Sequence, residues 1–331
     1  SMHRPIESIL SGPAASTMGA LALAADPGVN AAVIDIGGTT TDISVLVSGD
    51  PVFDRHGAVI AGHATLVLAL FARSIGLGGD SEVRCDQSGV RIGPCSAGTP
   101  AALGGNAVTP TDAAAALGLA QIGSRTRAIR ALADFAGPIG LSPMAAAERI
   151  VSAFAAQLAA EVEAVYTSLE SAPVYTVSEM LTSPNIRPVR LIGLGAPAPV
   201  FVPRAAELMG LPFELLPFHA AANAIGAAAS RPTTSITLHA DTALGILTIP
   251  EAGYRAQLPS RQDFGLRQAR AEALTWAERA ARSLGADADA AHDVSIVEEE
   301  SFNVVRGFYT VGRIFSIKAQ VRPKARRVDE A

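Results

Sequence analysis

Cysteine is scarce in this sequence, which has only Cys85 and Cys95 among 331 residues. Two cysteines cannot form the disulfide network that staples small secreted domains, and they do not give the ligand spacing of a zinc site. We therefore expect a protein of a reducing compartment whose fold depends on its hydrophobic core. A chain of this length buries enough apolar surface for one large domain or two ordinary ones.

Charge is also sparse. Charged residues make up 17% of the sequence and the formal net charge is -5. This mild acidity argues against a nucleic-acid-binding surface or a patch for anionic membranes, and the basic cluster at 322–327 is short. No apolar run reaches the roughly 18 residues of a membrane-spanning helix, and Ser1–Arg4 does not lead into a signal peptide. We expect no nucleic-acid partner, no membrane and a cytoplasmic location.

The most informative stretch runs from Ala31 to Val47. Two apolar, β-branched runs at 31–36 and 43–47 predict neighbouring strands in an α/β protein. Between them, Gly37 and Gly38 carry no Cβ, so the chain can bend sharply and its backbone can approach a ligand closely. The sequence therefore predicts a strand, a tight glycine turn and a second strand.

Polar side chains crowd this turn. Thr39, Thr40 and Thr41 supply hydroxyls, and Asp35 and Asp42 place one carboxylate at each end. Backbone N–H groups and hydroxyls suit a phosphate, while carboxylates hold Mg²⁺ directly or through its waters. The alternative is an ordinary hairpin turn in which aspartate simply favours the turn conformation, but such a turn needs only about two residues. We favour a phosphate-binding loop.

The run Asp-Ile-Gly-Gly-Thr-Thr-Thr-Asp at 35–42 resembles the phosphate loop of the actin, heat-shock chaperone and sugar-kinase superfamily. Within it, the hydantoinase A and 5-oxoprolinase family is the most similar, and the resemblance extends from residue 6 to about residue 230. It includes Ser-Gly-Pro-Ala at 11–14 and the glycine-rich stretch 74–80. This sequence departs from the family where Phe71-Ala72-Arg73 replaces Asp-x-His and where Asp80 replaces a glycine.

The resemblance implies a fold of the ribonuclease-H-like, actin-type ATPase class over residues 1–230, with helices on both faces of the sheet. Residues 231–331 have a different character, because strand-like runs at 233–250, 294–300 and 311–321 surround an amphipathic helix at 262–284. We expect a smaller α+β module there. Its acidic run at 298–300 is either a cation site or, as is commoner for adjacent acids on a strand, a solvated edge.

Further helices are predicted in the larger domain. The apolar stretch 62–76 predicts a buried helix, and the stretch 143–171 predicts a long packing helix with Pro143 at its first position. A buried strand at 189–192 should precede a helix at 203–209. Asp112 lies in the first turn of a helix capped by Thr109 or Thr111, where it can serve the cap, the active site or both.

The resemblance also implies ATP and Mg²⁺ as cofactors and assigns residues to them. Asp35 and Asp42 would hold Mg²⁺ and, together with Asp112, act in catalysis. The loop residues Gly37, Gly38, Thr39, Thr40 and Thr41 would hold the phosphates, and a second glycine-rich turn would seat the adenosine through Gly193, Gly195, Ala196 and Pro197.

Three functions are compatible with these expectations. The first is an ATP-dependent hydrolase of a cyclic amide, of the hydantoin or 5-oxoproline type, which acts by phosphorylation of the amide oxygen. The second is an ATP-dependent carboxylase subunit of the same family. The third is an actin-like chaperone or reactivating factor that uses nucleotide to change shape.

Members of the family carry an earlier Asp-x-Gly-Gly-Thr-x-Thr-Asp, and nothing in Ser1–Asn30 resembles it. We therefore expect this chain to supply one half of the nucleotide site, with an upstream domain or a second subunit as its partner. By itself it should be inactive or weakly active. Homo-oligomerisation is left open by the sequence.

Overall fold

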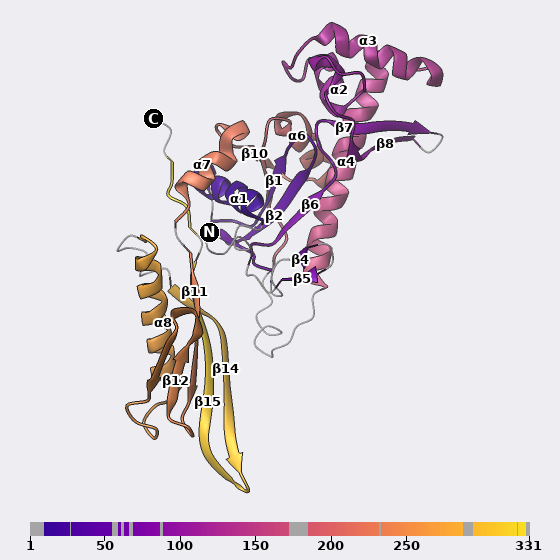
Figure 1. Ribbon diagram of the computed structural model, residues 1–331. Coiled ribbons are helices and arrows are strands. Elements are labelled where there is room, and N and C mark those ends of the chain that lie inside the picture. The colour runs from indigo at the N-terminus through magenta and orange to yellow at the C-terminus, as the bar shows by residue number, and fades with distance from the viewer. Residues whose placement is uncertain are drawn as a thin grey trace. The chain divides into compact units, whose positions relative to one another are not determined.

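The computed structural model describes residues 10–26, 28–54, 59–60, 63–65, 69–86, 89–171, 185–231, 233–286, 294–322 and 324–328. The chain divides into two compact units (Figure 1). The large unit comprises Ser1–Ala229 and Ala325–Ala331, and the small unit comprises Ser230–Lys324. Among the described residues, no helix combines the length and the apolar character needed to cross a bilayer.

A mixed sheet forms the centre of the large unit, which confirms the α/β class. Its strand order is β10-β9-β1-β2-β3, and β6 also pairs with β2. The predicted hairpin is present, because β1 and β2 pair antiparallel, while β9 runs parallel to both β1 and β10. The bounds are β1 Ala31–Ile36, β2 Thr41–Val47, β3 Asp50–Pro51, β6 Ala72–Ile75, β9 Arg190–Leu194 and β10 Phe213–Leu215.

Helices cover both faces of this sheet. Alternate residues of β1 point to opposite faces, so Ala32, Ile34 and Ile36 join one buried cluster while Ala31 and Val33 join another. The first cluster includes apolar residues of α2 (Pro110–Leu117), α3 (Arg125–Ala136), α4 (Pro143–Glu170) and α6 (Ala198–Met209). The second includes those of α1 (Ser11–Leu23) and α7 (Ala222–Ala229). Burial on both faces explains why β1 is apolar apart from Asp35.

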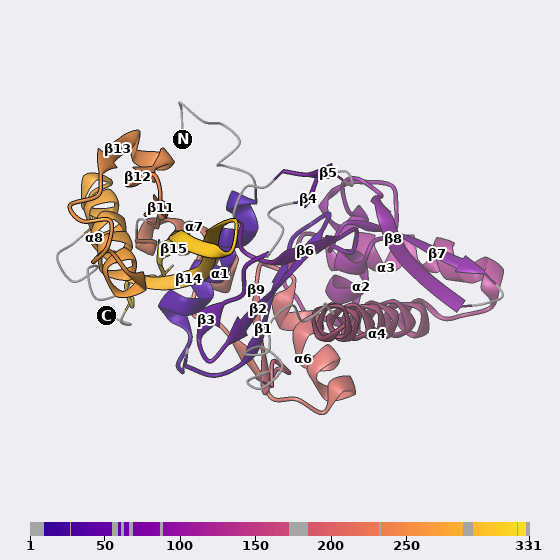
Figure 2. The same ribbon diagram turned by 90° about the horizontal axis from the view of Figure 1, so that it is seen from below.

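The long helix α4 organises the rest of the large unit. Both ribbon views place α2, α3 and a two-stranded hairpin, β7 (Ser81–Asp86) with β8 (Gly89–Ser96), around one end of α4 (Figure 1 and Figure 2). The predicted helix at 143–171 is confirmed almost to the residue. Its buried residues recur at the three- and four-residue spacing of a helix face, and they include Ile150, Phe154 and Leu158.

The predicted helix at 62–76 is wrong. This stretch contains β5 (His63–Ala64), which pairs with β4 (Val59–Ile60), and β6, which pairs with β2. Residues 62 and 66–68 lie outside the described part of the chain. A short apolar run without a polar face does not distinguish a buried helix from a strand. Residues 72–75 form a strand here because β2 has a free edge with which they can pair.

The start of α6 also differs from the prediction. The helix begins at Ala198, with Pro199 in its first turn and Pro203 inside it. Proline is well tolerated in a first turn because the N–H that it lacks has no partner there. The helix therefore starts five residues before the predicted start at residue 203, directly after the glycine-rich turn 193–197.

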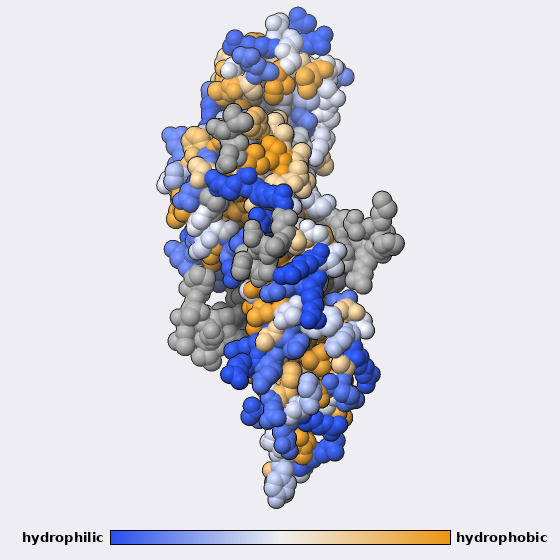
Figure 3. Space-filling view, turned by 90° about the vertical axis from the view of Figure 1, so that its left-hand side faces the viewer, coloured by the Kyte–Doolittle hydropathy of each residue, from blue (hydrophilic) through white to orange (hydrophobic). Residues whose placement is uncertain are grey.

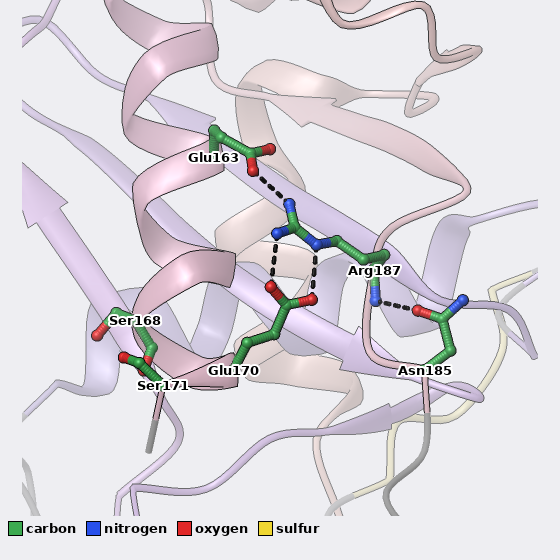
Figure 4. A network of polar contacts seen from close by, with 6 residues as sticks. All are labelled: Glu163, Ser168, Glu170, Ser171, Asn185 and Arg187. Atoms are coloured by element: carbon green, nitrogen blue, oxygen red, sulfur yellow. Dashed lines mark hydrogen bonds and ion pairs between the residues drawn. The ribbon is translucent and has the colours of Figure 1, made fainter.

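Arg187 fixes the chain just before β9. Its guanidinium donates to Glu163 of α4 at 2.5 Å and to both carboxylate oxygens of Glu170 at 2.6 and 2.5 Å (Figure 4). The Arg187 backbone N–H donates to the side chain of Asn185. Bidentate pairing of this kind holds a defined geometry, so the end of α4 positions the strand that leads to the glycine-rich turn.

The small unit is a five-stranded antiparallel sheet with one helix on it. The strand order is β13-β12-β11-β15-β14. Helix α8 (Leu266–Ser283) buries an alanine on every turn against the sheet, at positions 269, 273, 277 and 281. The strand bounds are β11 Ser235–Asp241, β12 Ile246–Ile249, β13 Tyr254–Gln257, β14 Val294–Arg306 and β15 Tyr309–Val321.

The surface reflects the low content of charge. Figure 3 shows patches of apolar residues set between polar ones on the face that it presents. With 49% hydrophobic and 17% charged residues, the protein has too few charges to cover its surface uniformly.

Candidate functional site

The two acidic residues of the β1–β2 hairpin face each other. Asp35 of β1 lies directly opposite Asp42 of β2 in the antiparallel register. Between them the chain turns through Gly37 and Gly38, and the turn is closed by a hydrogen bond from the Gly37 N–H to the Thr40 carbonyl at 2.9 Å. Opposed like charges destabilise a strand pair. The hairpin therefore brings two carboxylates close together at its end.

A second glycine-rich segment packs on this turn. The N–H of Gly79 donates to the Gly37 carbonyl at 3.0 Å, and the N–H of Asp80 donates to the Gly38 carbonyl at 2.6 Å. A Cβ on Gly78 would lie 2.4 Å from the Gly38 carbonyl oxygen, so only glycine permits this approach. The stretch 74–80 thus supports the turn directly.

Asp80 brings a third carboxylate close to the turn. A Cβ on Gly38 would lie 2.6 Å from Oδ2 of Asp80, and the Thr111 hydroxyl donates to its Oδ1 at 3.3 Å. Burial raises the pKa of Asp80, the hydrogen bond from Thr111 lowers it, and the charge of Asp112 raises it. Sequence reasoning noted Asp80 only as a departure from the family pattern. Its signal was an acid in place of a glycine in the glycine-rich stretch 74–80.

Ser16 is a second residue that sequence reasoning missed. Its hydroxyl, on α1, donates to Oδ2 of Asp35 at 2.5 Å. Its neighbour Thr17 shares a hydrogen bond of 2.8 Å with Ser44 of β2. Two polar residues buried within an apolar, alanine-rich helix were the available signal, because buried hydroxyls require partners.

Asp35 is the titratable group most affected by this environment. Burial raises its pKa above the usual value, the hydrogen bond from Ser16 lowers it, and the negative charge of Asp42 raises it again. The net direction is upward. A cation between the two carboxylates would remove the repulsion and restore the ionised form.

The other glycine-rich turn reaches the same place. Gly195 has a positive φ of 89°, and a Cβ there would lie 2.1 Å from the Ile36 carbonyl oxygen and 2.8 Å from Oδ1 of Asp35. Its N–H donates to the His219 carbonyl at 2.8 Å. The parallel pairing of β1 with β9 therefore places the turn after β9 against the turn after β1.

These segments line one cleft of about 380 Å³ in the large unit. Its lining includes most of the predicted residues, namely Asp35, Asp42, Gly37, Gly38, Thr40, Gly195, Ala196 and Pro197. It also includes residues that were not predicted, namely Ile36, Asp80, Leu103, Thr111, Ile122, Ala220 and Asn223.

Four predicted residues do not line the cleft. Thr39 lies on the exposed turn. The hydroxyl of Thr41 is buried and donates to the Leu77 carbonyl at 2.5 Å, so the expectation that all three threonine hydroxyls surround one spot is wrong. A Cβ on Gly193 would meet Val202 and Leu215, so this glycine serves packing between β9 and its neighbours.

Asp112 is the fourth. It is fully buried, and its carboxylate accepts hydrogen bonds from four donors: the N–H groups of Ala101 and Ala102, and the N–H and hydroxyl of Thr109. Of the two predicted caps, Thr109 caps the helix, and it forms a capping box with Asp112. These hydrogen bonds give Asp112 a structural role, because they hold the 3₁₀ turn Ala101–Leu103 in place. Leu103 at the end of this turn lies on the cleft wall.

Replacing Gly195 by alanine tests how closely the two turns must approach. We expect Gly195→Ala to destabilise the protein by about 3 kcal/mol or more, because it adds a backbone clash to the strain of a positive φ. The matched control is Gly210→Ala. Gly210 has a φ of 65° but no atom within 4 Å of its Cβ position, so that variant should lose only about 1–2 kcal/mol. Equal losses in denaturant unfolding would contradict the proposed contact.

The sequence matches the family described as Hydantoinase/oxoprolinase over residues 1–236. No curated protein matches it. Solved structures that share its fold include two ATP-dependent enzymes. The first is the nucleotide-free acetone carboxylase from a study of ATP-dependent acetone carboxylation, with a TM-score of 0.61 and 18% identity. The second is the ATP-dependent caprolactamase from Pseudomonas jessenii, with a TM-score of 0.61 and 19% identity.

These similarities cover nearly all of the present chain but only part of the other two. The acetone carboxylase matches 96% of this chain and 49% of its own, and the caprolactamase matches 97% of this chain and 51% of its own. The present chain thus spans about half the length of each.

Proposed function

Because the chain belongs to the hydantoinase/oxoprolinase family, we propose that its cleft binds Mg²⁺ and the phosphates of ATP in the ATP-dependent hydrolysis of a cyclic amide. The observation that carries the proposal is the pair Asp35 and Asp42, opposed across a glycine turn and lining one cleft with Gly195. The proposed substrate is of the hydantoin or 5-oxoproline type. We further propose that the sheet belongs to the ribonuclease-H-like class of actin-type ATPases, for which the hairpin beside parallel β9 and β10 is the support.

The residues of the cleft fit Mg²⁺. The two opposed carboxylates supply oxygen ligands and negative charge, which this ion prefers. Within the described part of the chain, no group of three or more His, Cys, Asp or Glu side chains is arranged to hold a metal. Mg²⁺ commonly binds through one or two carboxylates and completes its shell with water and phosphate oxygens, so Asp35 and Asp42 suffice. When bound, Mg²⁺ would neutralise charge on the phosphates.

The chain's own groups would position the reactants. The turn 37–40 lies where it can hold phosphate oxygens through its backbone, and the stretch 77–80 keeps that turn in place through the contacts described above. Ala196 and Pro197 form the adjoining wall, where the adenosine would lie. Phosphoryl transfer depends chiefly on such positioning and on charge stabilisation.

The proposed reaction overcomes the low reactivity of an amide. The terminal phosphoryl group of ATP is transferred to the amide oxygen and ADP is released. Water then adds to the activated carbon and the C–N bond of the ring breaks, which leaves an acyl phosphate. A second water hydrolyses this acyl phosphate, so that inorganic phosphate leaves and the ring-opened carboxylate forms. Each ring opening therefore consumes one ATP and two waters.

A carboxylase is the second candidate, and the fold shared with the acetone carboxylase favours it as much as the fold shared with the caprolactamase favours the hydrolase. The same cleft could serve phosphorylation of a ketone or of bicarbonate. One assay separates the candidates. The protein, together with any partner domain or subunit, is supplied with Mg²⁺, ATP and either a panel of cyclic amides or a ketone with bicarbonate.

We expect a ring-opened amino acid and one ADP per product, detected by mass spectrometry and a coupled assay. Carboxylated ketone would assign the second function instead. Nucleotide-dependent binding of a protein partner without either product would indicate a chaperone. Absence of any Mg²⁺-dependent ATP binding in calorimetry would refute the proposed site itself.

A further inference from the structure

The outer strand of the small unit has an exposed edge. β14 is the last strand of the sheet, paired on one side with β15. From Val297 to Asn303 every residue of β14 is exposed. Among the exposed side chains are large apolar ones, including Phe302 at 55% and Val305 at 58% exposure. A long strand with a free edge offers a template for pairing with another strand.

The hairpin of β14 and β15 also extends beyond the rest of its sheet (Figure 1). β11 pairs with β15 only as far as Ile314, which lies opposite Phe302 of β14. In the described small unit, no third strand supports the hairpin beyond that point, where Phe308 is fully exposed. A two-stranded hairpin alone is marginally stable in water. Pairing with an added strand would therefore stabilise the hairpin of β14 and β15.

The charges of β14 select one partner and one register. We propose that β14 pairs antiparallel with β14 of a second copy of this chain, with Asn303 opposite Asn303 on the two-fold axis. In that register Glu300 of each copy lies opposite Arg306 of the other, and Phe302 lies opposite Val304. Each pair occurs twice, because a two-fold interface uses the same surface on both copies. Opposite charges and apolar pairs directly across a strand pair are stabilising.

The side chains in these pairs share one face of the sheet. Glu299 pairs with Arg270 of α8 at 2.5 Å, so it lies on the helix-covered face. Glu300, Phe302, Val304 and Arg306 therefore lie on the other face, since side chains alternate along a strand. Ile314 lies beside Phe302 on that face. Two copies would join these residues into one apolar patch flanked by ion pairs.

The acidic run 298–300 disfavours other registers of the same strand pair. Glu298 already pairs with Lys318 at 2.9 Å, and Glu299 with Arg270, whereas Glu300 and Arg306 make no ion pair with any described residue. A register centred on Glu299 would set Glu298 opposite Glu300 and Glu299 opposite itself. Like charges directly opposite are destabilising. The register centred on Asn303 brings no two acids together.

Charge reversal tests this interface on the full chain. Sedimentation equilibrium of residues 1–331 should show a monomer–dimer equilibrium. Glu300→Arg and Arg306→Glu should each weaken dimerisation about tenfold or more, because each places like charges opposite one another twice. Mixing the two variants should restore association as a heterodimer, since one then carries two arginines and the other two glutamates. Exposed charges of α8 provide the controls, as Glu272→Arg and Arg267→Glu should leave the dimer unchanged.

A cysteine at the axis tests the register. In a Cys85→Ser, Cys95→Ser background, Asn303→Cys should form a disulfide-linked dimer under mild oxidation. Ser301→Cys should not, because Ser301 faces Val305 of the other copy. A chain that stays monomeric at all concentrations would overturn the proposal. A dimer whose dissociation constant is unchanged by the charge reversals would overturn it as well.

Discussion

Asp35→Asn is expected to weaken Mg²⁺-dependent ATP binding by roughly a hundredfold or more, because it removes one of the two opposed carboxylates proposed to hold the ion. The same change should raise the melting temperature of the ligand-free protein by about 2–4 °C. Burial and the charge of Asp42 hold the folded-state pKa of Asp35 above its ordinary value of 3.8. Weaker ATP binding together with a higher melting temperature would show that Asp35 serves the binding site and does not stabilise the fold.

The sign of the stability effect follows from proton linkage. A carboxyl with a raised folded-state pKa binds its proton more tightly in the folded protein than in the unfolded chain. Its contribution to stability is therefore fully present below pH 3.8 and is lost as pH rises through the folded-state pKa. At neutral pH the ionised carboxylate costs stability, and asparagine removes this cost while it can still accept the Ser16 hydroxyl.

Calorimetric titration with Mg²⁺ and ATP, and thermal unfolding at neutral pH without metal, measure the two effects. Asp134→Asn, a change of an exposed acid on α3, serves as the control and should alter neither. An Asp35→Asn variant that binds as well as the parent would contradict the proposed metal site. A lower melting temperature would contradict the proposed cost of the buried charge.

The second large effect concerns turnover. We expect residues 1–331 alone to hydrolyse ATP at least roughly a hundredfold more slowly than the same chain with a complementary nucleotide-binding domain or subunit. The chain spans about half the length of the acetone carboxylase and of the caprolactamase, and the proposed site contains one phosphate turn. Groups that surround the terminal phosphate and exclude water each contribute a few kcal/mol to lowering a barrier of this kind.

The comparison uses ATP hydrolysis under the same Mg²⁺ concentration and with the same cyclic amide. Binding of ATP by the chain alone should persist, because Asp35, Asp42 and both glycine turns belong to it. Equal turnover with and without the complementary domain would show that one half suffices. The proposal of a shared nucleotide site would then be wrong, while the metal site tested above would still stand.

The sequence alone determined the centre of the large unit. The β-branched runs on either side of Gly37 and Gly38 favour strands joined by a tight turn, and the apolar periodicity of α4 gives that helix one buried face. These signals are local, because spacing along the chain fixes which side chains share a face. The pairing of Asp35 with Asp42 followed from the hairpin itself.

Only the tertiary structure decided which side chains reach the cleft. Thr40, in the turn, lines it, whereas Thr41, the first residue of β2, donates its hydroxyl to the buried Leu77 carbonyl. Asp80 and Ser16 meet the hairpin from segments distant in sequence. The apolar stretch around β6 became a strand because β2 had an unpaired edge to satisfy. Such contacts depend on which elements meet in space, and the spacing of residues along the chain does not specify which elements meet.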